Sequence, residues 1–165
     1  MNRHSILSCT CSAVFVFFLL TACGDSGQKA EKGKFAPPPR QAPMTLEEAE
    51  KDWRNNKGVG PIASVSLGEI DPAMVESGIG VFEINCTACH DPFKEKIGPA
   101  LLGITERRRP EWIMNMILNP VEMAKSDPIC IGLLAQYNTV MADQGITEPQ
   151  ARDLLEYFRT LKLEQ

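Results

Sequence analysis

The stretch Cys86-Thr87-Ala88-Cys89-His90 decides how the rest of the 165-residue sequence is interpreted. It separates two thiols by three residues, about one helical turn, and places an imidazole directly after the second thiol. The Cys-x-x-Cys-His pattern is the attachment motif of a c-type haem. Each thiol can add to a vinyl group of the same porphyrin, and the histidine can then bind the iron. We therefore predict one covalent haem c, attached to Cys86 and Cys89, with His90 as an iron ligand.

Two other interpretations of the motif are weaker. A thioredoxin-like redox pair needs a βαβ context, and the sequence past residue 71 shows no strand-like alternation. A zinc site needs four ligands, and Cys130 is the only plausible ligand outside the motif. Two cysteines beside one histidine also make an awkward geometry for zinc.

The composition excludes several classes of protein. A hydrophobic content of 44% excludes a wholly disordered chain, and a charged fraction of 23% is ordinary for a globular one. The net charge of −4 argues against a nucleic-acid partner, because a dedicated nucleic-acid binder carries a basic face. Two histidines and the lack of an acidic cluster argue against a His-rich or two-carboxylate metal enzyme.

Residues 1–22 are predicted to be an export signal, with a basic start and an apolar run too short to cross roughly 30 Å of hydrocarbon. The run ends in Leu20-Thr21-Ala22-Cys23, which resembles a bacterial lipobox, in which the cysteine is diacylated. We expect Cys23 to anchor the protein to a membrane of the bacterial cell envelope, facing the periplasm. Several acyl chains bind a membrane stably, whereas a single chain binds only marginally. Ordinary signal cleavage near Ala22 is the alternative.

Two segments are predicted between the signal and the domain. Residues 23–44 begin at the lipidated cysteine and are rich in proline and glycine, so we expect a flexible tether. Residues 45–70 form an N-terminal extension. In it, Thr45 and Glu48 make a capping-box pattern, which predicts a short helix over 45–56.

Residues 71–165 are predicted to form a small all-α domain. Asp71 and Pro72 are typical of a helix start. Helices are expected over 71–85, 110–118, more weakly 120–136, and 147–163. The last opens with a second capping box, made by Thr147 and Gln150. A domain of about a hundred residues has a small core, which would benefit from a large apolar cofactor inside it.

Together these features resemble the class I cytochrome c family over about residues 71–163. Gly78 and Phe82, ahead of the motif, are similar to the family's N-terminal helix, where a glycine and an aromatic residue pack against the C-terminal helix. The resemblance implies Tyr157 or Phe158 as the packing partner. It also implies a small all-α fold wrapped around one covalent haem.

The resemblance implies two further site residues. Gly98-Pro99 resembles the family's Gly-Pro-x-Leu loop, whose proline carbonyl accepts a hydrogen bond from the haem histidine and would fix the orientation of His90. The second iron ligand of the family is usually a methionine. Met141 stands at the family's position before the C-terminal helix, although Ala142 replaces the proline that often follows. We expect His90 and Met141 to be the two iron ligands.

The other methionines have weaker claims. The mature chain also holds Met44, Met74, Met114, Met116 and Met123. Met114 and Met116 fall in an apolar helical segment, where core packing is the better explanation. A methionine in an apolar loop, without an iron bond, remains the alternative for Met141.

The family resemblance implies an electron carrier, not an enzyme, that shuttles single electrons between an exported redox donor and acceptor, with no small-molecule substrate. Residues 105–120, with Asp127-Pro128, are similar to monohaem lipoprotein cytochromes of nitrous-oxide respiration clusters. That similarity implies delivery to a periplasmic reductase such as nitrous oxide reductase. The alternatives are a haem enzyme or gas sensor with an open sixth iron position, and a fixed electron-entry subunit of a larger membrane complex.

Other residues have open roles in the sequence. Apolar neighbours favour a buried, inert thiol at Cys130 over a redox or intermolecular one. Arg107-Arg108-Arg109 could dock an acidic partner, reach the haem propionates or form a solvated turn. Trp112 could pack on the haem edge or simply fill the core.

Overall fold

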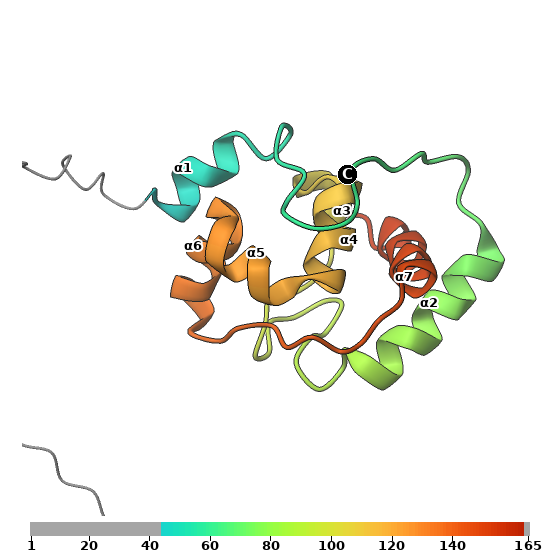
Figure 1. Cartoon of the computed structure of the whole chain (residues 1–165). Coiled ribbons are helices and arrows are strands. Elements are labelled where there is room, and N and C mark those ends of the chain that lie inside the picture. The colour runs from blue at the N-terminus through green and yellow to red at the C-terminus, as the bar shows by residue number, and fades with distance from the viewer. Residues whose placement is uncertain (1–43, 164–165) are drawn as a thin grey trace, which may run out of the picture. The chain divides into compact units, whose positions relative to one another are not determined.

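The computed structural model describes residues 44–163, whose regular secondary structure is entirely helical (Figure 1). The helices are α1 (Leu46–Lys51), α2 (Pro72–Asn85), α3 (Ile104–Arg107), α4 (Pro110–Leu118), α5 (Pro120–Ser126), α6 (Pro128–Tyr137) and α7 (Glu148–Thr160). The predicted all-α fold is confirmed. The predicted signal, Cys23 and the tether up to residue 43 lie outside the described residues. Among residues 44–163, none of the helices has the length and hydrophobicity that a membrane crossing requires.

The helix starts follow the local signals in the sequence. The Thr45 and Thr147 side chains both accept a hydrogen bond from the backbone of the third helical residue, and both capping boxes are complete. The Asp71 side chain accepts from the N–H of Ala73 at 2.9 Å, ahead of Pro72. Local hydrogen bonds therefore fix where α1, α2 and α7 begin.

The helix ends and interruptions differ from the expectations. The first helix stops at Lys51, not at residue 56, and α7 stops at Thr160, not at residue 163. The reason at α7 is that the carbonyl of Leu161 accepts the N–H of Gly103 at 2.7 Å, which holds the chain in a loop. The weak helix expected over 120–136 is two helices, because the Asp127 side chain caps α6.

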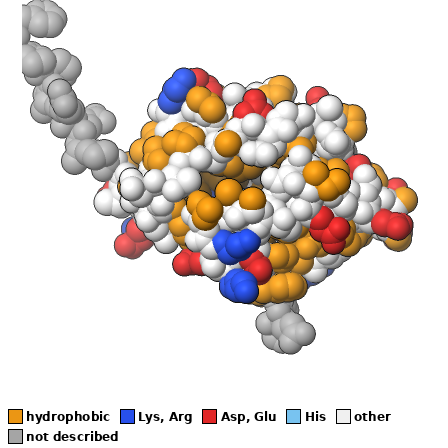
Figure 2. Space-filling model, turned by 90° about the horizontal axis from the view of Figure 1, so that it is seen from below, with side chains coloured by type: hydrophobic (Ala, Val, Ile, Leu, Met, Phe, Trp, Pro, Cys, Tyr) orange, Lys and Arg blue, Asp and Glu red, His pale blue; other side chains and the backbone are white. Residues whose placement is uncertain are grey.

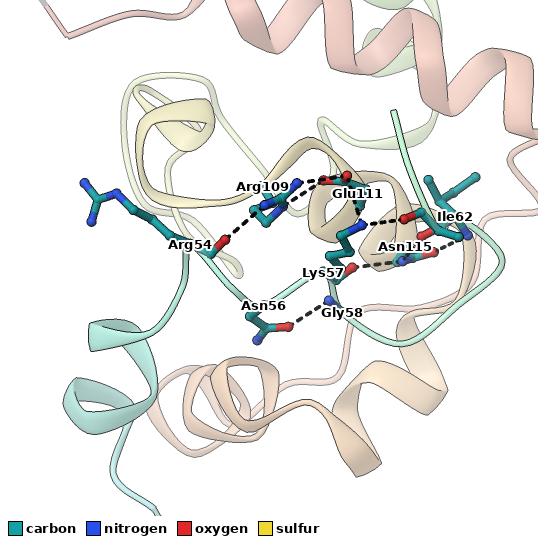
Figure 3. Close-up of polar contacts among 9 residues, drawn as sticks. Arg54, Asn56, Lys57, Gly58, Ile62, Arg109, Glu111 and Asn115 are labelled. Atoms are coloured by element: carbon teal, nitrogen blue, oxygen red, sulfur yellow. Dashed lines mark hydrogen bonds and ion pairs between the residues drawn. The ribbon is translucent and has the colours of Figure 1, made fainter. Parts of the chain in front are cut away.

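The segment that follows α1, over residues 57–62, lies against α4 (Figure 3). The amide of Asn115 donates to the carbonyls of Lys57 at 2.9 Å and Ile62 at 3.0 Å, and its oxygen accepts the Ile62 N–H at 2.9 Å. Ile62 and Ala49 are both buried in the hydrophobic core. The extension therefore belongs to the same packed unit as the helices that follow it.

Helices α2 and α7 cross at close range (Figure 1). A Cβ atom at Gly78 would lie 2.2 Å from the carbonyl oxygen of Asp153, so only glycine permits this approach. Phe82 packs edge-on against both Tyr157 and Phe158, with ring centroids 5.5 Å and 6.1 Å apart. The packing of α2 on the C-terminal helix thus uses both of the aromatic residues that were considered.

We expect Gly78→Ala to lower the free energy of unfolding of the haem-loaded protein by about 1–3 kcal/mol, because the added methyl group forces the α2–α7 contact apart. Gly80→Ala, on the same helix, is the matched control. Its Cβ would meet nothing within 4 Å, and alanine should stabilise the helix by about 0.5–1 kcal/mol. Denaturant unfolding of the three proteins measures both effects. Equal effects of the two substitutions would contradict the packing argument.

Candidate haem site

A cavity of about 620 Å³ lies among the helices and is lined mostly by apolar side chains. Its walls come from all seven described helices and from the loops around residues 86–102 and 139–146. Figure 2 shows hydrophobic side chains gathered around a hollow on one face of the described domain. The volume lies within the range of about 300–1,000 Å³ typical of ligand and cofactor sites.

The Cys-x-x-Cys-His motif lines this cavity directly after α2. The carbonyl of Cys86 accepts the N–H groups of Cys89 at 3.1 Å and His90 at 2.9 Å, so the motif is one tight turn. All three side chains line the cavity. Both thiols are free, and Cys89 is exposed to solvent. Burial raises the pKa of the Cys86 thiol to about 11, and the charge of the neighbouring Cys89 makes a smaller contribution in the same direction.

The imidazole of His90 is held by the loop that follows the motif. Its Nδ1 lies 3.1 Å from the carbonyl oxygen of Pro99. A carbonyl only accepts, so Nδ1 donates its proton there and the lone pair of Nε2 is left for a metal. A Cβ atom at Gly98 would lie 2.4 Å from Cε1 of the ring, so the loop approaches as closely as glycine allows. The Gly98 N–H also donates to the carbonyl of Cys89 at 2.9 Å.

Two methionines line the cavity, Met141 and Met116. The thioether of Met116 is already in contact with the thiol of Cys130, at a sulfur–sulfur distance of 3.6 Å. Met114 is buried in the core, as its helical position indicates. Met116 also packs against the core, as expected, and in addition lines the cavity. The structure thus brings Met141 and His90 to one cavity and leaves the sulfur of Met141 without a hydrogen bond among the described residues.

The remaining methionines lie away from the cavity. They are Met44, Met74 and Met123. Met44 is exposed, whereas Met123 is fully buried, and its sulfur accepts the Val59 N–H at 3.0 Å.

These residues fit haem c. The cavity is apolar and of suitable size, two free thiols stand on its wall, and one imidazole is oriented with its Nε2 free. In the part of the chain that the structure describes, no three His, Cys, Asp or Glu side chains come close enough to hold a metal ion. That finding argues against the zinc alternative, which needs four ligands.

The arginine triplet is not a solvated turn. Arg107 and Arg108 line the cavity, and Arg107 donates to the carbonyls of Leu102 at 2.6 Å and Ala100 at 2.8 Å, which fixes the loop behind the motif. Arg108 is 4% exposed, and its Nε is buried without a partner in the described chain. Arg109 turns away to pair with Glu111 at 3.0 Å.

The position of Trp112 is compatible with both of the roles that were considered. It is buried in the core, and it also lines the cavity. Its indole N–H donates to the carboxylate of Asp127 at 3.1 Å, which holds the ring in one orientation.

Cys130 is a buried free thiol on α6, and burial, together with the nearby Asp127 carboxylate, raises its pKa to about 11. A neutral thiol at pH 7 is a poor nucleophile, which agrees with an inert role.

Sequence reasoning did not connect the N-terminal extension with the cavity. Leu46 and Glu50, on α1, both line the cavity. The capping box predicted their helix, but no pattern in the sequence connects that helix with a motif 40 residues further on.

Comparison with known proteins indicates the family of the chain. The family model for cytochrome c matches residues 75–162. Among solved structures, cytochrome c from Rhodothermus marinus is 41% identical, with a TM-score of 0.61, and the match covers 73% of this chain and 97% of that one. Engineered Rhodothermus marinus cytochrome c, Rma TDE, is 40% identical over the same shares, with a TM-score of 0.61, or 0.58 when bound to a carbene intermediate. No curated protein sequence matches. The chain belongs to the cytochrome c family, whose members carry covalent haem c and transfer electrons.

Proposed function

We propose that this protein is a membrane-anchored monohaem cytochrome c that passes single electrons between exported respiratory partners. In this proposal Cys86 and Cys89 hold the haem, and His90 and Met141 bind its iron. The observation that carries the proposal is that all four side chains line one apolar cavity. Haem c bound there supplies a one-electron redox couple.

The chain's own residues would position the cofactor and exclude water. The Pro99 carbonyl fixes the ring of His90 through Nδ1, which raises the basicity of the other nitrogen. The buried side chains Phe82, Leu154 and Phe158 line the cavity and keep its dielectric constant low. With methionine as the second protein ligand, no iron position stays open for an external ligand. This arrangement favours electron transfer over small-molecule chemistry.

An exposed apolar surface near the motif supports transient docking of redox partners. Cys89 is exposed, and Phe93 and Ile97, which line the cavity with it, are large exposed hydrophobic side chains. Electron-transfer complexes bury little surface, below about 1,200 Å². We propose that donor and acceptor use this side of the protein in turn.

The assignment of Met141 is tested with Met141→Ala in the haem-loaded protein. We expect the variant to lose the weak red absorption band of a methionine–iron bond. We also expect its ferrous form to bind carbon monoxide at least about tenfold more tightly, because no protein ligand has to be displaced. Met116→Leu, the other methionine of the cavity wall, should keep the wild-type behaviour. A high-spin wild-type protein that binds carbon monoxide at once would instead support the sensor or enzyme.

Membrane anchoring rests on the sequence Leu20-Thr21-Ala22-Cys23. In a bacterium that matures lipoproteins, we expect the full chain to incorporate labelled palmitate and to leave the membrane fraction with detergent but not with high salt. Cys23→Ala should lose both label and membrane retention, since the acylated side chain is gone. Cys11→Ala, within the signal, is the matched control. Unlabelled wild-type protein would exclude the lipid anchor, and salt-resistant retention of Cys23→Ala would favour a fixed complex subunit.

The similarity of residues 105–120 to lipoprotein cytochromes of nitrous-oxide respiration supports nitrous oxide reductase as the acceptor. We expect the reduced haem protein to be oxidised when the purified reductase and nitrous oxide are both present, because only then is the electron consumed. The haem absorbance, followed by stopped flow, measures the rate. Omitting nitrous oxide is the control. If a chemical reductant drives the reductase while this protein does not, the acceptor is a different one.

A further inference from the structure

Helix α1 precedes the residues that the family model matches, yet it forms part of the cavity wall. It lies against α6 (Figure 1). A Cβ atom at Gly132 on α6 would lie 2.7 Å from the Cβ of Leu46, so α1 sits as close to α6 as a glycine permits. Leu46 and Glu50 extend from this helix to the cavity. The extension therefore contributes two side chains to the surroundings of the haem.

Glu50 holds the most buried cation of the cavity wall. Arg108 is 4% exposed, and its Nη2 donates to Oε1 of Glu50 at 2.7 Å. Its Nη1 donates to the Arg107 carbonyl at 2.6 Å, and its guanidinium lies 5.2 Å from the centre of the Trp112 ring. Within residues 44–163, Glu50 is the one carboxylate paired with Arg108. A buried charge is costly without such a partner.

The segment that follows α1 is tied to the core on the side shown in Figure 3, which fixes the helix in place. Lys57 pairs with the buried carboxylate of Glu111 at 3.7 Å, and Arg109 donates to the carbonyl of Arg54 at 3.1 Å. The side chain of Asn56 donates to the carboxylate of Asp127 at 2.7 Å. These contacts hold Glu50 in a constant position relative to the cavity.

Other charged groups also line the cavity. Arg107 is half-buried there, and Glu95 accepts a hydrogen bond from the Tyr137 hydroxyl at 2.7 Å. Glu95 is exposed to solvent, where water screens its charge. Arg108 is more deeply buried than Arg107, so water screens its charge least among the cations of the wall. The charge that remains toward the cavity therefore depends on its pairing with Glu50.

We propose that Glu50 is a positioning residue that lowers the reduction potential of the haem by neutralising Arg108. An oxidised haem carries one more positive charge than a reduced one, so an unpaired guanidinium in the wall disfavours oxidation. The Glu50 carboxylate opposes that effect. This inference requires haem c in the cavity but does not depend on the sixth ligand, the anchor or the redox partners.

The test is Glu50→Gln in the full-length haem-loaded protein, with the potential measured by equilibrium redox titration. Glutamine has the size of Glu50 and keeps an oxygen that can accept the hydrogen bond from Arg108, and the Glu50 side chain is 43% exposed, so the protein should fold. We expect the equilibrium to shift at least about threefold toward the reduced form, a rise of about 28 mV at 59 mV per tenfold for one electron. Glu47→Gln is the matched control: it removes the same charge from the same helix, at a side chain that is 87% exposed. Its shift should be less than half as large.

A double-mutant cycle identifies the route of the effect. In an Arg108→Gln background, Glu50→Gln should shift the potential no more than Glu47→Gln does. Equal shifts for Glu50→Gln and Glu47→Gln, a lowered potential, or a shift that persists without Arg108 would each overturn the proposal. The red methionine–iron band, recorded on the same samples, reports the iron ligands separately, so a wrong assignment of Met141 is distinguishable from a wrong assignment of Glu50.

Discussion

The contact between Gly78 and the backbone of Asp153 is the constraint on which the rest of the structure depends. At Gly78 the backbone of α2 approaches the backbone of α7 with no α2 side chain between them, and Phe82, one turn further on, packs against the aromatic residues of α7. The motif cysteine Cys86 directly ends α2, and the loop with Met141 directly precedes α7. The crossing of two helices far apart in the sequence thus brings the attachment motif and the candidate sixth ligand to one cavity.

A second close approach that only glycine permits occurs beside His90. The approach of the Gly98 backbone to the imidazole, closer than any Cβ would allow, lets the Pro99 carbonyl reach Nδ1. Orientation of the ring is therefore set by backbone, which loses little entropy on ordering because a proline is already restricted. Arg107 holds the next turn of this loop through two carbonyls. A rigid loop of this kind suits a haem site, because the geometry around the iron should change little when the iron is oxidised or reduced.

Features that depend on local chemistry could be predicted from the sequence. The helix over 110–118 has both of its expected ends, because Pro110 starts it and Asn119 ends it ahead of a second proline. The covalent haem follows from five consecutive residues. Core packing was predicted for Met114 and Met116 and holds for both. The additional contact of Met116 with the cavity was not predicted, although positions two apart on a helix point about 200° away from each other. The pairing of Glu50 with Arg108 links positions 58 residues apart, and no local pattern encodes it.

The contact between α1 and α6 also bears on the order in which parts of the protein fold. Leu46 belongs to an early part of the chain, while Gly132, which it contacts, is synthesised after the attachment motif. Closing a loop of this length costs entropy that only the finished contact repays, so such contacts form late in folding. We therefore expect the cavity wall made by α1 to close late in folding. That side of the cavity would then be open to a bulky, flat cofactor, and α1, the earliest of the described helices, would be among the last to pack over it.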